Sequence, residues 1–391
     1  MDRNRLGTLR DFHRDGLLND TLPFWMNHTI DREYGGFLNY LDADGSVYHT
    51  DKPVWVLGRF TWLTALLYNE VERRPEWLET ARHGIEFLEK HAFDSDGRMF
   101  YELTRDGRPL RQRRYLFSET FGVIAFAEYA RATGDAARLQ RARDTYRLIL
   151  HYQRTPGLLP PKIIPETRRM KAHAMPMILV ATSQQIRKAD PEPLYDQVIT
   201  ESIREILAHF VHADRKALLE TVGPNGEFLD TPDGRCINPG HAIESAWFIM
   251  EEGRRRGDRA MIEAACRVLD WSLAWGWDAE YGGIRYFADV AGKPCVQYEH
   301  DMKLWWPHCE ALYATLLAHH LTGRQEYAEW YERVHEYAFA HFPDRQHGEW
   351  FKYLHRDGTV SHTLKGNAWA GPFHLPRMQL YCWKLLEEML A

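Results

Sequence analysis

The segment Asp278-Ala-Glu-Tyr-Gly-Gly-Ile284, with Ala291-Gly292 shortly behind it, decides how this chain of 391 residues folds, because its pattern occurs five times. The other copies read Asp31-Arg-Glu-Tyr-Gly-Gly-Phe with Asp44-Gly45, Asp94-Ser-Asp-Gly-Arg-Met-Phe with Asp106-Gly107, Pro224-Asn-Gly-Glu-Phe with Asp233-Gly234, and Asp344-Arg-Gln-His-Gly-Glu-Trp with Asp357-Gly358. The glycine of each trailing pair suits a tight turn between two strands, where a residue must tolerate positive φ. Each copy therefore predicts a β-hairpin that leads into an apolar helix. The copies recur at roughly 55 to 65 residues or a multiple of that, which indicates one repeated supersecondary unit.

Two kinds of helix are predicted between these segments. One kind has a single apolar stripe and a charged opposite face, as in Leu78, Ala81, Ile85 and Leu88. Such one-sided helices are expected near residues 6–27, 75–91, 136–153, 192–211, 258–275 and 325–341. The other kind is apolar around more of its circumference, which fits burial on both sides. These helices are expected near residues 53–70, 115–131, 173–188, 239–256, 303–321 and 376–390.

The alternation of the two kinds predicts an all-α fold, an (α/α)6 toroid with six outer and six inner helices. The hairpins would join outer to inner helices at one mouth, so that the inner helices present their N-terminal ends to a central cavity. No Pro/Gly/Ser-rich linker divides the chain, and residues 1–391 are expected to form one domain. Functional residues are therefore expected at the hairpin end.

Composition favours a globular enzyme and argues against several other classes. Apolar residues make up 45% of the chain and aromatic residues 13%, with 14 tryptophans, which is ample for a core and a pocket. The formal net charge of −6 makes nucleic acid and anionic membranes unexpected partners. No apolar leader opens the sequence, and no stretch approaches the roughly 18 apolar residues of a membrane span. Five scattered cysteines without a CxxC pair indicate reduced thiols in a cytoplasmic protein.

The predicted helix at 239–256 begins with the residues of a general base. Asn238 is a suitable N-cap and Pro239 a suitable first residue, which places His241 in the first turn and Glu244 one turn later. The positive end of a helix disfavours the charged imidazolium. We therefore expect a neutral His241 that Glu244 orients for proton abstraction.

The predicted helix at 303–321 begins with an aromatic pair. Trp305 and Trp306 offer indole faces on which the C–H face of a sugar can stack, beside the cation of Lys303 and the acid of Glu310. Adjacent helical positions do not share a face, which leaves open whether both indoles reach a cavity. His308, on the same helix, is interpreted as structural.

Equivalent places in the repeats carry more polar groups. The sequence has Arg59 in the first repeat, Glu119 in the second, and His374 with Arg377 in the last. A histidine taken alone is more often structural than catalytic. Here two histidines, several carboxylates and an arginine are expected on one rim of the cavity. This grouping favours a catalytic role for His241 and His374.

Several known motifs are absent from the sequence. It contains no HExxH, no clear zinc spacing, no GxSxG elbow, no GxGxxG fingerprint and no GxxxxGK[ST] loop. An acid–base reaction that needs neither metal nor cofactor is the most economical prediction.

Seven strings resemble, in order and spacing, the N-acylglucosamine 2-epimerase family, whose mammalian members are also called renin-binding proteins. They are FWMNHTIDREYGGF, WVLGRFTW, NPGHAIESAWF, DAEYGGIRYF, MKLWWPHCEAL, GEWFKYLHRDG and PFHLPR. The resemblance implies an (α/α)6 barrel, a homodimer, and interconversion of N-acetylglucosamine and N-acetylmannosamine. It also implies that His241, His374, Arg59, Glu244 and Glu310 are the catalytic residues. Cellobiose 2-epimerases, mannose 2-epimerases and aldose–ketose isomerases belong to the same superfamily.

Two features bear on how far the resemblance extends. Many acetylhexosamine epimerases need ATP as an activator and carry a Gly/Lys-containing loop before the third inner helix. In this chain residues 152–165 contain one glycine and four prolines, so ATP activation is not favoured. His173 falls near a position where the resemblance to cellobiose epimerases and isomerases implies a histidine, and it is expected to contact substrate.

The sequence thus predicts a sugar 2-epimerase that removes and returns the C2 proton of an open-chain aldose. Inversion next to a carbonyl needs a base on one face and an acid on the other, which two histidines can supply. Arg59, helped by Lys303 or Arg377, is expected to stabilise the enolate oxygen. Glu244 and Glu310 are expected to orient the histidines or to hold substrate hydroxyls.

Three other activities stay open. Delivery of the proton to C1 instead of C2 would give an aldose–ketose isomerase, such as one acting on mannose. The (α/α)6 toroid also hosts inverting glycoside hydrolases that use two carboxylates. A sugar-binding protein without activity is the third alternative. The sequence does not fix which sugar, acetylated, free or disaccharide, the site takes.

Overall fold

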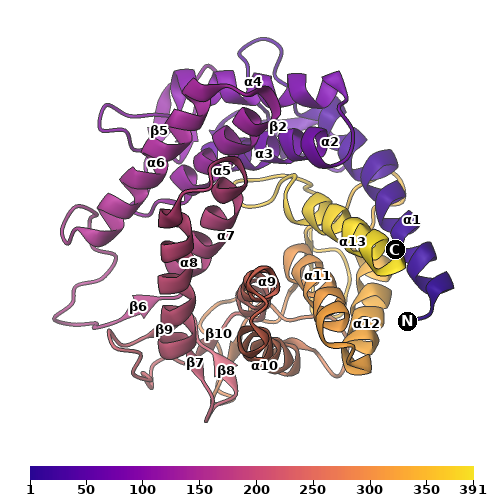
Figure 1. Cartoon of the computed structure of the whole chain (residues 1–391). Coiled ribbons are helices and arrows are strands. Elements are labelled where there is room, and N and C mark those ends of the chain that lie inside the picture. The colour runs from indigo at the N-terminus through magenta and orange to yellow at the C-terminus, as the bar shows by residue number, and fades with distance from the viewer.

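Two rings of helices, one inside the other, form the computed structural model, which describes all of residues 1–391 (Figure 1). The inner ring consists of α3 (Val54–Glu70), α5 (Phe117–Thr133), α7 (Ala174–Ala189), α9 (Pro239–Arg256), α11 (Trp305–Thr322) and α13 (His374–Leu390). The outer ring consists of α1 (Arg3–Gly16) with α2 (Leu22–His28), α4 (Pro75–His91), α6 (Ala136–Arg154), α8 (Pro193–Glu205), α10 (Arg259–Gly276) and α12 (Gln325–His341). The predicted (α/α)6 toroid is confirmed.

The helices begin and end close to where the apolar periodicity of the sequence predicts. The exception is that two outer segments contain a π-helical turn. A π-helical turn, η1 (Leu17–Thr21), separates α1 from α2, and a second, η2 (Ile206–Phe210), follows α8. Both turns lie in outer segments that were predicted as continuous helices, at 6–27 and 192–211. A single π turn adds one residue to a helix. The apolar stripe changes too little for the sequence pattern to reveal the turn.

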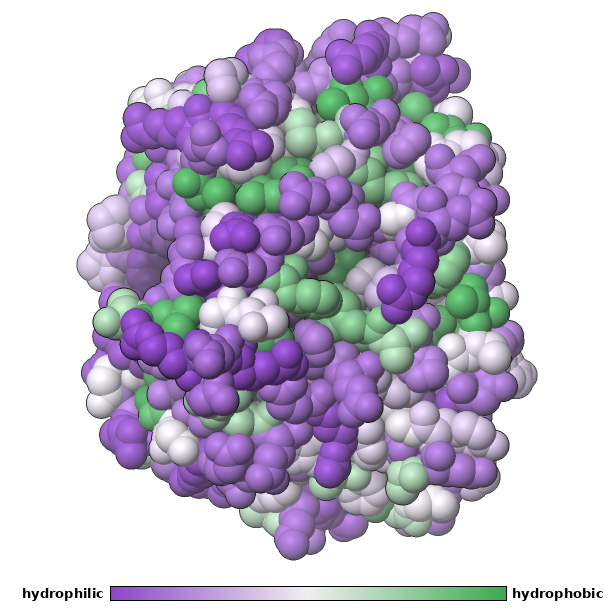
Figure 2. Space-filling view, turned by 90° about the vertical axis from the view of Figure 1, so that its right-hand side faces the viewer, coloured by the Kyte–Doolittle hydropathy of each residue, from purple (hydrophilic) through white to green (hydrophobic).

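Burial explains why the helices sort into two rings. In α4 the buried side chains include Trp77, Ala81, Ile85 and Leu88, which form one stripe. In α5 every residue from 118 to 130 is buried. An amphipathic helix can face water on one side, whereas a helix apolar all round must be covered. The face in Figure 2 is accordingly mostly hydrophilic, with apolar residues in small groups. No helix is both long and apolar enough to cross a membrane.

Short strands occupy the connections from outer to inner helices, and so they gather at one mouth. The paired strands are β1 (Tyr40–Leu41) with β2 (Val47–His49); β3 (Lys52–Pro53) with β4 (Glu102–Leu103) and β5 (Pro109–Arg111); β6 (Lys171–Ala172) with β9 (Thr221–Val222); β7 (Val211–His212) with β8 (Ala217–Leu218); β10 (Cys236–Ile237) with β11 (Ala288–Asp289); and β12 (Lys303–Leu304) with β13 (Tyr353–Leu354). All pairs are antiparallel.

The hairpin prediction holds for some copies and is wrong for others. The turns at Gly45 and Gly107 have φ of +83° and +90° and join β1 to β2 and β4 to β5, as predicted. Gly234 has no positive φ, and β10 pairs with β11 of the next copy instead of forming a local hairpin. Neighbouring copies meet at one mouth, so pairing between them competes with the local turn.

The first aspartate of three copies holds a buried lysine. Lys303 Nζ donates to Asp278 Oδ2 at 2.9 Å, and both side chains are fully buried. The same 2.9 Å contact joins Lys52 to Asp31, and Lys365 to Asp344. The other oxygen of each aspartate accepts backbone N–H groups two and three residues on. The predicted role of Lys303 in substrate binding is therefore wrong, because its ammonium holds the hairpin segment in place.

Replacing Lys303 by methionine is expected to lower the free energy of unfolding by roughly 1–3 kcal/mol, because the buried Asp278 carboxylate loses its lysine and keeps only Arg285 and Arg356 as cationic partners. Turnover by the folded fraction should change little. Denaturant titration with activity measured below the transition tests both parts. Lys293→Met is the control, since Lys293 is half exposed and lies 3.7 Å from Asp230. A large fall in kcat with unchanged stability would contradict the structural role.

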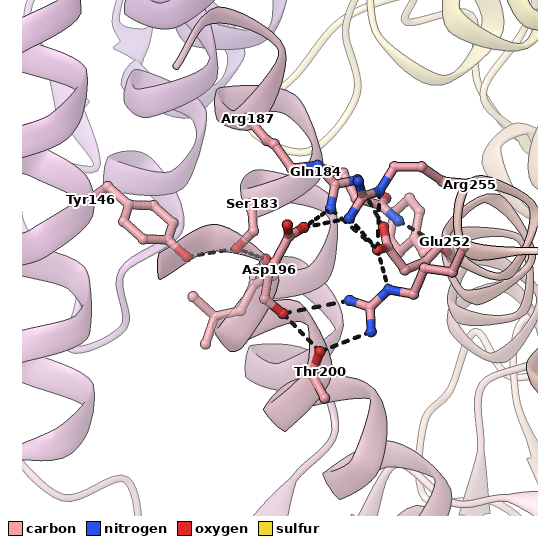
Figure 3. A network of polar contacts seen from close by, with 11 residues as sticks. Tyr146, Ser183, Gln184, Arg187, Asp196, Thr200, Glu252 and Arg255 are labelled. Atoms are coloured by element: carbon pink, nitrogen blue, oxygen red, sulfur yellow. Dashed lines mark hydrogen bonds and ion pairs between the residues drawn. The ribbon is translucent and has the colours of Figure 1, made fainter. Parts of the chain in front are cut away.

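A polar network fastens α7, α8 and α9 at the end of the barrel opposite the strands (Figure 3). The buried carboxylate of Glu252 accepts from Arg187 at 2.8 Å and from Arg256 at 2.6 Å. Asp196 bridges to Arg187 and, at 2.5 Å, to Arg255. These ion pairs join the inner helices α7 and α9 to each other and to the outer helix α8.

Candidate active site

A cavity of about 630 Å³ opens at the strand-bearing mouth, between the N-terminal halves of the inner helices. All six inner helices contribute to its wall, which is mostly aromatic and aliphatic. Seven of the residues predicted from sequence line it: Arg59, His241, Glu244, Trp305, Trp306, His374 and Arg377. The repeats predict that the N-terminal ends of the inner helices meet at one cavity, and the structure does bring these side chains together there.

His241 is held from behind by a carboxylate that the sequence did not reveal. Asn238 Oδ1 accepts the backbone N–H of His241 at 3.1 Å, as expected of an N-cap. The imidazole Nδ1 lies 3.0 Å from Oε2 of Glu220, which follows β8. The prediction that Glu244 orients His241 is wrong, because Glu244 pairs with Arg377. Because Nδ1 of His241 contacts Glu220, Nε2 is the ring nitrogen that can exchange a proton in the cavity.

Glu220 also decides the charge of His241. Burial disfavours the imidazolium, but attraction to the Glu220 carboxylate outweighs it and raises the pKa of His241. Burial likewise opposes ionisation of Glu220, but His241 and His173 outweigh it and hold the pKa of that carboxyl well below its ordinary value. Contact with the Glu220 carboxylate therefore shifts the pKa of His241 in the direction opposite to the one expected from the helix end.

His374 has the opposite electrostatic environment. Its Nδ1 lies 2.6 Å from Oε1 of Glu310, a buried carboxylate of α11. Burial and the neighbouring Arg377 guanidinium together lower the pKa of His374 well below its ordinary value. Glu310 also accepts from Trp247 Nε1 at 2.7 Å and from Arg377 at 2.6 Å. It thus positions His374 from behind and does not itself line the cavity.

Arg377 lies between two acidic groups. One of its terminal nitrogens is 2.6 Å from Oε1 of Glu244 and 2.6 Å from Oε1 of Glu310. Glu244, Glu310 and His374 bring their ligand atoms within 4.8 Å of one another, a cluster that could hold a metal ion. The guanidinium contacts both carboxylates, so their charges already have a cationic partner.

The two histidines flank one indole. The Trp306 ring centroid is 5.2 Å from that of His241 and 5.6 Å from that of His374. Trp305 also lines the cavity and lies 6.1 Å from the His374 ring. Both indoles therefore reach the cavity, a point that the sequence left open. Trp306 is thus a direct neighbour of both imidazoles in the cavity wall.

Arg59 is a cation without a carboxylate partner. Its guanidinium carbon lies 4.3 Å, 4.2 Å and 4.6 Å from the ring centroids of Trp55, Phe121 and Phe373. Its Nε has no hydrogen-bond partner. Burial lowers the pKa of Arg59 to about 9, so the group is still charged at neutral pH. The cavity therefore contains a positive charge that no carboxylate contacts directly and that Glu244 offsets only from a distance.

Three predicted substrate-binding residues lie outside the cavity wall. Lys303 is bound to Asp278, as described above. Glu119 is buried, with Oε1 2.5 Å from Arg98 Nε and accepting the Met99 backbone N–H at 2.9 Å. His173 is fully buried behind His241. For Glu119 and His173, too, the predicted contact with substrate is wrong, because each side chain is turned toward the protein interior.

His173 and His308 have definite partners in that interior. His173 Nε2 lies 2.9 Å from Ser245 Oγ, and its Nδ1 is 3.6 Å from Glu220 Oε1. His308 Nε2 accepts the Ile284 N–H at 2.9 Å, while its Nδ1 lies 2.7 Å from the Leu304 carbonyl. Burial lowers the pKa of His308 to about 3. His308 thus bridges a hairpin segment to α11, in agreement with its structural interpretation.

The arrangement can perform acid–base chemistry on both faces of one carbon. Two imidazoles face one cavity, and their surroundings move their pKa values in opposite directions. Paired groups of this kind supply an acid and a base at the same pH. The positive charge of Arg59 suits an oxygen that becomes negative during the reaction.

Comparison with known proteins adds independent information. The family model described as N-acylglucosamine 2-epimerase matches residues 35–374. The chain is 38% identical to the N-acylglucosamine 2-epimerase of Bos taurus over 385 residues, which cover 96% of this chain and 90% of that protein.

Solved structures show the same fold. A cellobiose 2-epimerase from Spirochaeta thermophila superposes with a TM-score of 0.86 at 21% identity and covers 100% of this chain and 99% of its own. A D-mannose isomerase superposes with a TM-score of 0.80 at 18% identity, covering 97% of this chain and 98% of its own. At these identities the likeness establishes the fold and not the substrate.

Proposed function

The chain belongs to the N-acylglucosamine 2-epimerase family, and on this premise we propose that it interconverts N-acetylglucosamine and N-acetylmannosamine by inversion at C2. One observation carries the proposal: His241 and His374 flank Trp306 in one cavity, and their pKa values are displaced in opposite directions. A reaction that takes a proton from one face of a carbon and returns one to the other face needs this pairing.

The directions of the two pKa shifts define the first step. His374, whose pKa is lowered, accepts the C2 proton through Nε2, while His241, whose pKa is raised, donates a proton from the other face. The electrons left at C2 move onto the C1 oxygen, where Arg59 stabilises the enolate. After one inversion the two histidines have exchanged protonation states, so the reverse reaction uses them in the opposite roles.

Product analysis tests the proposed function against its alternatives. Incubation with N-acetylmannosamine, mannose, glucose, fructose and cellobiose is followed by chromatography of the sugars. N-acetylglucosamine formed from N-acetylmannosamine is the expected result. A ketose from mannose, with no reaction of N-acetylmannosamine, would replace the proposal by an aldose–ketose isomerase. Hydrolysis is disfavoured because the carboxylates Glu244 and Glu310 both bind Arg377.

Replacing Glu220 by glutamine is expected to change the pH profile. The Glu220 carboxylate stabilises the imidazolium of His241, so its loss lowers the pKa of His241. In the direction that needs protonated His241, the alkaline limb of kcat/KM should therefore move to lower pH, by about one unit or more. Glu227→Gln, at an exposed site seven residues away, is the control. An unchanged alkaline limb in Glu220→Gln would contradict this role.

We propose that the reaction needs neither a metal ion nor a nucleotide. Arg377 already supplies the cation between Glu244 and Glu310, the carboxylates of the potential metal cluster. Activity is expected to survive exhaustive EDTA treatment and to change little when ATP is added. Loss of turnover on chelation that one divalent ion restores would contradict this, as would large saturable activation by ATP.

A further inference from the structure

Glu349, in the last hairpin copy, has a backbone conformation that disfavours a side chain. Its φ is +59°, and it is one of only two residues other than glycine with a positive φ. The equivalent positions in the copies at 31–37 and 278–284 are Gly36 and Gly283, with φ of +67° and +73°. A residue with a Cβ is destabilised in this left-handed region, whereas glycine is not. Because strained residues cluster at functional sites, the glutamate in place of glycine indicates a role for its side chain.

The Glu349 carboxylate binds a lysine inside the protein. Lys352 Nζ donates to both of its oxygens, at 2.6 Å and 2.5 Å, and both side chains are fully buried. Oε1 also accepts from Trp25 Nε1 at 3.2 Å, and Oε2 accepts the Trp350 backbone N–H at 2.6 Å. The Glu349 backbone N–H donates to Asp20 Oδ1 at 3.1 Å. The carboxylate thus contacts protein groups only, and it supplies the negative charge that a buried lysine needs.

Lys352 in turn supports a ring of the cavity wall. Its carbonyl oxygen accepts the Trp305 backbone N–H at 3.1 Å, and its ammonium lies 5.4 Å from the Trp305 ring centroid, within the range of a cation–π contact. Trp305 lines the cavity and Lys352 does not, so the lysine supports the ring from the protein side. The Trp305 Nε1 is buried and has no hydrogen-bond partner. No hydrogen bond of the indole itself therefore fixes the ring, and its orientation depends on packing and on Lys352.

The lysine pair of the copy at 31–37 has a similar construction but supports a different ring. Lys52 Nζ lies 2.9 Å from Asp31 Oδ2, and both side chains are fully buried. The same ammonium lies 4.4 Å from the Phe87 ring centroid. Phe87 belongs to the outer helix α4 and does not line the cavity. The two pairs therefore differ in that only Lys352 contacts a ring that a substrate can reach.

From this arrangement we infer that Glu349 and Lys352 are positioning residues, which hold the Trp305 indole in the orientation that stacks on the sugar; this rests on the proposed function. Neither residue lines the cavity, so neither takes part in the proton transfers at C2. A ring that stacks on the substrate and on the transition state alike lowers KM without raising kcat. Loss of the pair should therefore raise KM and leave kcat nearly unchanged.

Replacing both partners together tests this role, because removal of one alone would leave a buried charge. In Glu349→Gln/Lys352→Met, KM for N-acetylmannosamine should rise at least about tenfold while kcat changes at most about threefold. Asp31→Asn/Lys52→Met is the matched control, and its KM should stay within about twofold of wild type even where its thermal stability falls. In a Trp305→Phe background, loss of the Glu349–Lys352 pair should change KM at most about twofold further, since the ring that the pair positions is gone.

Glu349→Gln/Lys352→Gln keeps a polar pair without charge and provides a second variant should the first fail to fold. A wild-type KM in either folded variant overturns the positioning role, as does an equal rise of KM in the control or a full further rise in the Trp305→Phe background. Loss of folding in both variants while the control folds also overturns it, because the pair is then structural only.

The sugar used for these measurements separates this role from the proposed function. KM is measured with whichever sugar of the panel the wild type turns over. If that sugar is not N-acetylmannosamine, the proposed function fails and the same comparison of variants still decides the role of the pair. A wild type that turns over none of the five sugars overturns both.

Discussion

His374→Asn and His241→Asn are each expected to lower epimerisation at least about 100-fold, the low end of what a positioned acid or base contributes. Each imidazole is fixed by a different carboxylate, that of Glu310 at 2.6 Å from His374 and that of Glu220 at 3.0 Å from His241. Asparagine keeps a polar group of similar size but cannot carry the proton. Initial rates in both directions measure the loss. His320→Asn, at the far end of α11, should behave as wild type.

Isotope exchange separates the two histidines. In deuterium oxide the wild type should place deuterium at C2 of the product. A variant that keeps one histidine can still remove the C2 proton of one epimer and return deuterium to the same face, which gives exchange without inversion. The two variants should therefore prefer opposite epimers. Retention of the C2 proton during wild-type turnover, or the same preference in both variants, would rule out a base on each face.

Arg59→Gln is expected to lower kcat by about 10²–10³, the effect of removing one preorganised group from a developing oxyanion. The guanidinium lies 4.2 Å from the Phe121 ring, its Nε has no hydrogen-bond partner, and it lines the cavity, so its charge is available to a bound ligand. KM should change little, because the carbonyl oxygen of the bound aldose carries no full charge. Steady-state kinetics on N-acetylmannosamine measures both.

Arg113→Gln provides the matched control for Arg59. Arg113 also stacks on an aromatic ring, 4.2 Å from the Tyr101 centroid, but does not line the cavity. Comparable thermal unfolding of both variants would show that lost stacking is not the cause of a rate effect. A fall in kcat of less than about tenfold for Arg59→Gln, or an effect on KM alone, would contradict the role of Arg59 as oxyanion stabiliser.

The sequence by itself determined the architecture, because the features that define a helix or a turn lie within a few residues of one another. The period of the apolar residues placed all inner and outer helices, and the glycines at Gly45 and Gly107 marked tight turns with positive φ. Once the helices alternate, connectivity alone brings their N-terminal ends to one mouth. That is how His241 and His374, 133 positions apart, could be assigned to one cavity.

Tertiary structure alone decided which charged groups meet. The contacts that set the site join residues 21 apart for His241 and Glu220, 64 apart for His374 and Glu310, and 133 apart for Arg377 and Glu244. No periodicity links such positions, so the sequence paired His241 with its helical neighbour and missed the carboxylate behind it.

The same limit explains the residues that were wrongly placed in the site. Lys303, Glu119 and His173 sit at or near the starts of inner helices, as the catalytic residues do, but their side chains turn toward buried partners. Which way a side chain turns depends on where an opposite charge or a hydrogen-bond partner lies once the ring has closed. The sequence therefore determined the fold and the position of the cavity, whereas the direction of each pKa shift was decided by the assembled barrel.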